Sequence, residues 1–304
     1  MIFSPVHTII VSKHARSSPP GEPERRKMIQ GIELTNYHTH TPLCRHAQGT
    51  EEEYVLRAIQ NGFSVLGFAD HGAWPYESDY VSYMRMSVSE FWGYESRVRA
   101  LEEKYRGQIR IPLGMENEAF PPYINWLKEF KEEHLDYLIL GNHYDYNDEF
   151  NPDNHLPLND RGGFYFGYCS EKEQILRYGK RTVWGMETGV FDYLAHPDLF
   201  CFLYPVFDEE CAAVSRDLCA AAEAYHLPLE VNLNGMQRTD GGLGYPCSRF
   251  WEIASDYHIT AIVGYDAHRP DQLGRQDLHE KALDMLKELR IPVTDRLPCE
   301  NRKA

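Results

Sequence analysis

Short groups of histidine and carboxylate residues recur along this 304-residue chain, each directly after an apolar run. The groups are His38-Thr39-His40 with His46, Asp70-His71, Glu116-Asn117-Glu118, Asn142-His143, His196-Pro197-Asp198 and Asp266-Ala267-His268. Imidazole and carboxylate groups are common ligands of divalent metals. Because residues i and i+2 of a strand share a face, His38 and His40 can hold one ion together. The pattern predicts one metal site at the ends of successive strands, as at the mouth of a barrel.

A single histidine at a strand end is more often a structural or surface residue than a ligand. The joint occurrence of the groups favours a metal site, because a purely structural interpretation needs an independent coincidence at every strand end. Other carboxylates in or beside the groups, namely Asp70, Glu118, Asp145 and Asp198, can instead orient ligands through hydrogen bonds. For Asp198, direct coordination and such an orienting role stay equal alternatives.

The chain is acidic, with 31 basic and 46 acidic residues and a formal net charge of −15. Such a surface repels nucleic acids and anionic membranes, so we expect a small-molecule substrate, no nucleic-acid partner and no membrane partner. No apolar run is long enough to span a bilayer. The seven cysteines include no Cys-x-x-Cys pair, which indicates reduced thiols and a cytoplasmic protein.

The first 30 residues differ from the rest. A stretch rich in proline and charge at residues 17–27 cannot form a core, and Met28 follows it. We expect residues 1–30 to be a disordered or non-native N-terminal extension, with a native start at Met28 and a mobile tail as the alternatives. Residues 31–304 then form one domain.

Apolar runs alternate with helical patterns in this domain. Strands are predicted at 32–37, 64–69, 109–114, 136–141, 191–195, 228–233 and 260–264. Helices are predicted between them, including one that begins with a capping box at Thr50–Glu53 and one capped by Asp208. Repeated βα units predict an α/β fold with parallel strands, and about seven units are visible. The long polar and aromatic segment 144–168 is predicted to be a loop that covers the substrate.

Several of these motifs resemble a known family. His38–Thr41, Leu43–Ala47 and Gly67–Gly72 look like the start of a PHP domain (polymerase and histidinol phosphatase), and the later groups follow the family's order. The resemblance covers about residues 34–290 and is strongest to the histidinol-phosphatase branch. It implies a distorted (β/α)7 barrel of PHP type, with the metal site at the C-terminal ends of the strands.

The resemblance also implies a trinuclear centre of about three divalent metal ions, with zinc, manganese, iron and cobalt all compatible. Its nine ligand positions are filled here by His38, His40, His46, His71, Glu116, His143, His196, Asp266 and His268. In that family pattern Glu116 bridges two of the ions.

The implied activity is hydrolysis of a phosphomonoester by a metal-bridging hydroxide near Glu116. The general acid that protonates the leaving group is left open between Asp266 and a nearby histidine such as His268. The chain has no Asp-x-Asp-x-[Thr/Val] motif and no Cys-x5-Arg loop, which favours direct attack by water over a covalent intermediate.

Cations are expected to bind the phosphate oxygens that are not on metal. Arg238 is the first candidate, since residues 230–238 resemble a histidinol-phosphatase segment; Arg269 and Arg161 are further candidates. Glu230 is a candidate partner for a substrate amine. The aromatic residues Tyr144, Tyr146 and Phe164 are candidates to stack on a substrate imidazole.

Three functions stay open from the sequence. The first is hydrolysis of L-histidinol phosphate in histidine biosynthesis. The second is a PHP phosphoesterase that acts on another phosphomonoester or on nucleic acid. The third is a non-catalytic PHP module, against which the complete set of ligand positions argues. The sequence does not indicate an oligomeric state.

Overall fold

The computed structural model describes residues 28–76, 82–145, 164–238 and 242–297. Residues 1–27 of the predicted extension lie outside these ranges, as do Arg161, Tyr146 and most of the predicted loop 144–168. Among the described residues, no helix is long and apolar enough to cross a membrane.

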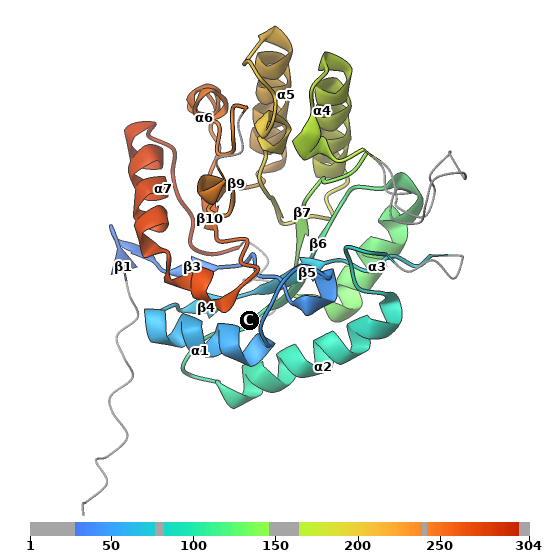
Figure 1. Ribbon diagram of the computed structural model, residues 1–304, viewed down its shortest axis with the longest axis vertical. Helices are drawn as coiled ribbons and strands as arrows, with labels where there is room; N and C mark the ends of the chain where they lie inside the picture. The colour runs from blue at the N-terminus through green and yellow to red at the C-terminus, as the bar shows by residue number, and fades with distance from the viewer. Residues whose placement is uncertain (1–27, 77–81, 146–163, 239–241, 298–304) are drawn as a thin grey trace, which may run out of the picture.

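Parallel strands form the centre of the molecule, and the helices surround them (Figure 1). The strands are β1 (Met28–Ile29), β2 (Ile32–Glu33), β3 (Thr35–Asn36), β4 (Val65–Leu66), β5 (Phe68–His71), β6 (Leu113–Asn117), β7 (Tyr137–Leu140), β8 (Tyr193–Leu194), β9 (Leu229–Asn232) and β10 (Ala261–Gly264). A six-stranded sheet has the order β10-β9-β8-β7-β6-β5, and a second parallel pair joins β3 to β4. The antiparallel pair β1-β2 precedes them.

The two ends of this strand series meet. The amide of His40 donates to the Ala267 carbonyl at 2.9 Å, and the amide of Ala267 donates to the His38 carbonyl at 3.1 Å. Because β4 continues into β5 across Gly67, the strands form seven positions around a closed circuit. The predicted distorted (β/α)7 barrel is confirmed.

Seven α-helices within the described ranges cover the strands. They are α1 (Glu51–Asn61), α2 (Val88–Lys104), α3 (Ile124–His134), α4 (Lys172–Glu187), α5 (Glu209–Tyr225), α6 (Ser248–Ala254) and α7 (Gln276–Glu288). Short 3-10 turns are η1 (Pro42–Cys44), η2 (Pro121–Tyr123), η4 (Phe166–Tyr168), η5 (Leu199–Cys201), η6 (Gly235–Gln237) and η7 (Pro270–Gly274). The predicted caps are present: Thr50 and Glu53 form a capping box, and the Asp208 carboxylate accepts from the Cys211 amide at 3.0 Å.

One predicted strand is displaced. The apolar run at 109–114 suggested a strand there, but β6 begins at Leu113 and continues to Asn117. Pro112 lacks an amide hydrogen and Arg110 forms only an isolated bridge with Val65, so the regular ladder begins after Pro112. This displacement places Glu116 inside the strand instead of beyond it.

Aromatic side chains fill the barrel below the strand ends. Tyr137 is 1% exposed, and its hydroxyl donates to the carbonyls of Tyr37 at 2.6 Å and Phe68 at 3.0 Å. A Cβ at Gly114 would lie 2.6 Å from the Tyr137 ring, so only glycine leaves room for that ring. The floor beneath the functional groups is therefore packed with side chains, as interiors of such barrels are.

Candidate metal centre

Glu116 lies at the centre of the histidine and carboxylate groups. Its Oε2 atom lies 3.3 Å from His38 Nε2 and 3.1 Å from His71 Nδ1. Its Oε1 atom lies 2.9 Å from His196 Nε2 and 3.6 Å from His143 Nε2. The two oxygens of one buried carboxylate thus face two different sets of imidazoles, which is the arrangement a carboxylate needs to bridge two ions.

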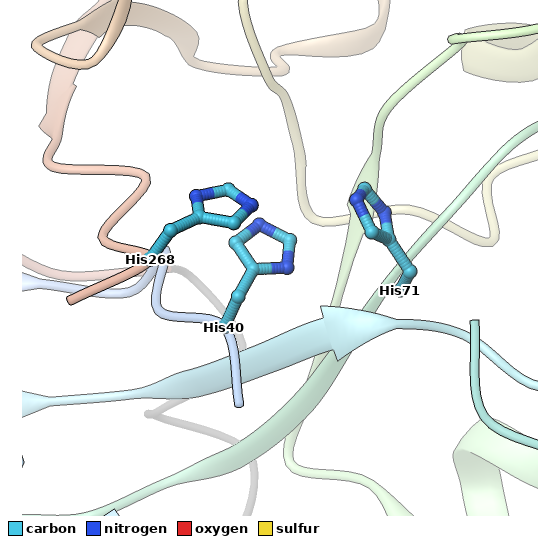
Figure 2. Close-up of side chains that lie close together, drawn as sticks. All are labelled: His40, His71 and His268. Carbon is cyan, nitrogen blue, oxygen red and sulfur yellow. The ribbon is translucent and has the colours of Figure 1, made fainter. Parts of the chain in front are cut away.

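A third set of donors gathers at the seam between the first and last strands. His40, His71 and His268 offer nitrogen atoms within 4.8 Å of one another, and Figure 2 shows their rings side by side. The His40 and His268 rings stack at 4.2 Å, and His46 stacks on His268 at 4.8 Å. Asp266 Oδ1 lies 3.0 Å from His40 Nε2, which connects this set to the one around Glu116. All nine predicted ligand positions therefore converge at one end of the barrel.

A buried carboxylate outside the predicted ligand set, that of Glu230, contacts one of the candidate imidazole ligands. Glu230 is fully buried, and its Oε2 atom lies 2.8 Å from His38 Nδ1. Asn232 donates to Glu230 at 2.7 Å and to Asp266 at 3.2 Å. Glu230 does not line the cavity at the barrel mouth, which differs from its predicted role as a partner for a substrate amine. In this place it fixes the ring of His38 and the tautomer that leaves Nε2 open.

The carboxylates whose roles the sequence left open differ in the groups that they contact. Asp70 lies 3.4 Å from His40 Nδ1 and accepts hydrogen bonds from the amide and hydroxyl of Thr41. Glu118 forms a doubly hydrogen-bonded pair with the buried Arg85, at 2.9 and 3.0 Å. Asp198 accepts from the Cys247 amide at 2.5 Å, and it forms no ion pair with an imidazole of the described residues.

Charge interactions keep the two central carboxylates ionised. Burial alone would raise their pKa values, but His143, His38 and His196 bring the pKa of Glu116 well below its usual range. His38 and His40 do the same to the pKa of Asp266. Both groups are therefore anionic ligands at neutral pH.

The pKa values of two neighbouring imidazoles are shifted in opposite directions. Burial disfavours the charged form of His40, but the negative charges of Asp266 and Asp70 beside its ring outweigh it and raise its pKa to about 9. Burial and the neighbouring His40 lower the pKa of His268 to about 3. Metal binding must displace the proton from His40, so the affinity for metal should rise with pH.

The donor set fits divalent cations by an independent criterion. Several buried donor atoms form no hydrogen bond with any described residue: His38 Nε2, His40 Nε2, His71 Nδ1, Glu116 Oε2, His143 Nδ1 and His196 Nδ1. Buried polar atoms are almost always hydrogen-bonded, and unpaired ones mark a place for an unrecorded partner. Nitrogen and carboxylate donors without partners are what a cluster of metal ions satisfies.

The backbone is strained at two of the candidate ligands. His196 has φ of 29° and Asp266 has φ of 47°, both in the left-handed region that residues other than glycine seldom adopt. Each lies two residues after the last residue of a strand, His196 after β8 and Asp266 after β10. Such strain persists where the surrounding structure fixes a side chain for function.

A cavity of about 870 Å3 opens above the candidate ligands. Two of the predicted cations line it, Arg238 and Arg269, and so does the predicted aromatic residue Tyr144. Arg238 also lies over the Phe202 ring at 5.2 Å. Phe164 does not line the cavity; it packs against Phe166, with ring centroids 6.2 Å apart.

Some residues around this site had no role assigned from the sequence. Tyr165 stacks parallel to His143 at 6.3 Å, and Tyr245 lies 6.2 Å from His196. Asn234 lines the cavity and donates to Asp266 at 3.2 Å. Arg85 had no surrounding motif, and its partner Glu118 is distant in the sequence, so only the folded structure identifies the pair.

Comparison with known proteins supports this geometry. The family described as PHP domain matches residues 36–234. A probable histidinol-phosphatase of Deinococcus radiodurans is 30% identical over 255 residues, covering 79% of this chain and 88% of that protein. The histidinol-phosphatase of Bacillus subtilis is 23% identical over 261 residues, covering 78% and 94%.

A solved structure resembles this fold. It is the histidinol phosphate phosphatase of Lactococcus lactis, in complex with zinc, L-histidinol and phosphate. The TM-score is 0.64 at 16% identity, with 86% of this chain and 96% of that chain covered. At this identity the likeness supports the fold alone.

Proposed function

The chain belongs to the PHP-domain family, and from this premise we propose that it is a metal-dependent phosphomonoesterase, a histidinol-phosphatase that converts L-histidinol phosphate to L-histidinol and phosphate. The observation that carries the proposal is the position of Glu116, whose two carboxylate oxygens face separate sets of imidazoles. A substrate dianion needs such concentrated positive charge before any nucleophile can approach phosphorus.

The nine converging residues would hold about three divalent ions. His38, His40, Glu116 and Asp266 would bind one; Glu116, His143 and His196 a second; His46, His71 and His268 a third. Ions bound there neutralise the phosphate charge and supply a hydroxide nucleophile at neutral pH. Zinc, manganese and iron all suit this donor set.

The protein's own residues have three tasks in this proposal. Arg238 and Arg269 line the cavity and bind phosphate oxygens by charge-assisted hydrogen bonds. Asp266 or His268 takes the proton that is released when water becomes hydroxide and passes it to the departing alkoxide, since both border the cavity and neither carries a proton of its own at neutral pH. Tyr144 and Tyr165 offer ring faces to the imidazole of the substrate.

The experiment is a phosphate-release assay over a panel that contains L-histidinol phosphate, other phosphomonoesters and single-stranded DNA. We expect L-histidinol phosphate to have by far the highest kcat/KM. Elemental analysis of the same protein, purified without chelator, should find about three divalent ions per chain. Preference for another phosphomonoester or for the oligonucleotide would reject the substrate, and one ion or none in active protein would reject the trinuclear centre.

A further inference from the structure

A second cavity, of about 590 Å3, lies beside α4 and shares no lining residue with the cavity above the metal centre. Three cations of α4 line it: Arg177, Lys180 and Arg181. They occupy positions i, i+3 and i+4, so they lie on one face of the helix (yellow-green in Figure 1). Like charges at this spacing destabilise a helix, which calls for a reason to gather them.

The remaining walls are apolar. Trp184 continues the same helical face one turn later, and Pro121 and Phe166 complete the lining around it. A cavity of this volume with apolar walls and few charged groups is typical of a site for a small organic molecule. The charged groups here are nearly all positive.

Positive charge is in excess in this cavity. Asp145 is the single acidic residue among the described residues that line it, and its Oδ2 atom pairs with Arg177 at 2.8 Å. Arg181 donates only to the neutral carbonyl of Ala119, at 3.2 Å, among its recorded hydrogen bonds, and burial lowers its pKa. Lys180 has no ion pair with any described residue. In a chain of net charge −15, this excess is not a general surface property.

We propose that this cavity binds an organic anion, a carboxylate or phosphate group carried on an apolar or aromatic body. The anionic group lies among the three cations and displaces Asp145 from Arg177, while the body packs on Trp184. The proposal does not depend on the reaction at the metal centre, because the two cavities are lined by different residues.

The cavity adjoins the segment that carries His143. Asn142 accepts from the Ala119 amide at 2.9 Å and donates to Thr182 of α4 at 3.0 Å. Asp145 accepts from the Phe164 amide at 2.8 Å through the oxygen that does not face Arg177. An occupant that takes Arg177 from Asp145 therefore acts on residues next to a candidate ligand, but its binding is measured separately from turnover.

The test uses 19F NMR of the full chain with 5-fluorotryptophan at its five tryptophans. The variant Trp184→Phe assigns the Trp184 resonance. The probes are 3-phenylpropionate and phenylphosphonate, with 3-phenylpropanol as the uncharged control. We expect both anions to shift the Trp184 resonance with a Kd of about 1 mM or lower, while the other four resonances stay in place. The tighter anion identifies the carboxylate or phosphate class.

Variants that change the charge of the cavity should change the affinity for the anions in opposite directions. Arg181→Gln and Lys180→Gln should each weaken binding by roughly tenfold, since each removes one charge-assisted contact. Asp145→Asn should tighten it, because the competing carboxylate is gone. Lys172→Gln removes a charge from the same helix outside the cavity, where Lys172 pairs with Glu210 at 2.7 Å, and should change nothing.

Three results would overturn the proposal. One is an unmoved Trp184 resonance at saturating probe. Another is equal binding of 3-phenylpropanol, which would make the cavity merely apolar. The last is unchanged affinity in both Arg181→Gln and Lys180→Gln when their spectra without probe match the parent protein.

Discussion

The buried pair of Arg85 and Glu118 should stabilise the fold only as a pair. Each residue is 1% exposed, and two hydrogen bonds of 2.9 and 3.0 Å join them. Burial by itself raises the pKa of Glu118, but Arg85 and His143 outweigh it and keep the carboxylate charged. Replacement of Arg85 by methionine leaves this charge buried, with His143, 3.7 Å away, as its one remaining charge partner among the described residues.

Removal of one member of a buried ion pair costs about 3–5 kcal/mol, whereas apolar replacement of both is often neutral. Arg85→Met should therefore lower the free energy of unfolding by about 3–5 kcal/mol, and Tm by roughly 6–20 °C for a domain of this size. The double variant Arg85→Met/Glu118→Met should recover most of that loss. Urea unfolding of the parent, both single variants and the double variant completes a double-mutant cycle.

The matched control is an exposed pair. Arg216 and Glu209 are 47% and 80% exposed, and Arg216→Met should change the free energy of unfolding by less than about 0.5 kcal/mol. If Arg85→Met melts with the parent, or the cycle gives no coupling, the pair does not act as argued. Because Glu118 also faces His143, Glu118→Met should weaken metal binding by roughly 10–100-fold, which metal titration measures independently of stability.

Three further predictions concern the metal centre, the phosphate site and the core. Glu116→Gln should reduce kcat by roughly 10³-fold or more, since it removes the charge shared by two imidazole sets. Turnover close to that of the parent protein would show that the catalytic site lies elsewhere. Arg238→Ala should lower kcat/KM by roughly 10- to 150-fold, because a hydrogen bond to a charged group contributes about 1.5–3 kcal/mol, and the metal content should be unchanged. A variant with the kcat/KM of the parent protein would show that Arg238 does not bind the substrate. Burial lowers the pKa of His279 to about 4, so the unfolded chain binds a proton between about pH 6.5 and 4 that the native state does not. Parent protein should therefore lose about 3 kcal/mol more than His279→Leu over that interval as pH falls; parallel profiles from urea unfolding would contradict this.

The convergence of the nine candidate ligands was predictable because its signal is local. Pairs such as His38 and His40 share a strand face, and every group follows an apolar run, so parallel topology alone brings them to one end of the barrel. The seven strand positions follow from the same runs. The largest displacement is that of β6, since Pro112 lacks the amide that the ladder requires, and the predicted strand 32–37 divides into β2 and β3.

Depth along a strand was not predictable in the same way. Glu230 belongs to a segment expected to meet the substrate, but it lies two residues before the end of β9 and so roughly 6–7 Å below it. At that depth it contacts His38 instead of the cavity. Arg85 is a different case, because its partner lies on another element and no spacing rule connects the two. Pairings of this kind depend on tertiary packing.

The seam where residues 38–40 meet Ala267 sets the order in which the site can be assembled. During synthesis His38 and His40 leave the ribosome long before Asp266 and His268. Domains fold as units, and contacts between distant segments form late. A complete set of donors therefore exists only once the chain has been made through His268, and a shorter nascent chain presents its first histidines without the carboxylate and imidazole that belong beside them. Metal bound by the complete set would then report on synthesis through this seam as well as on correct folding.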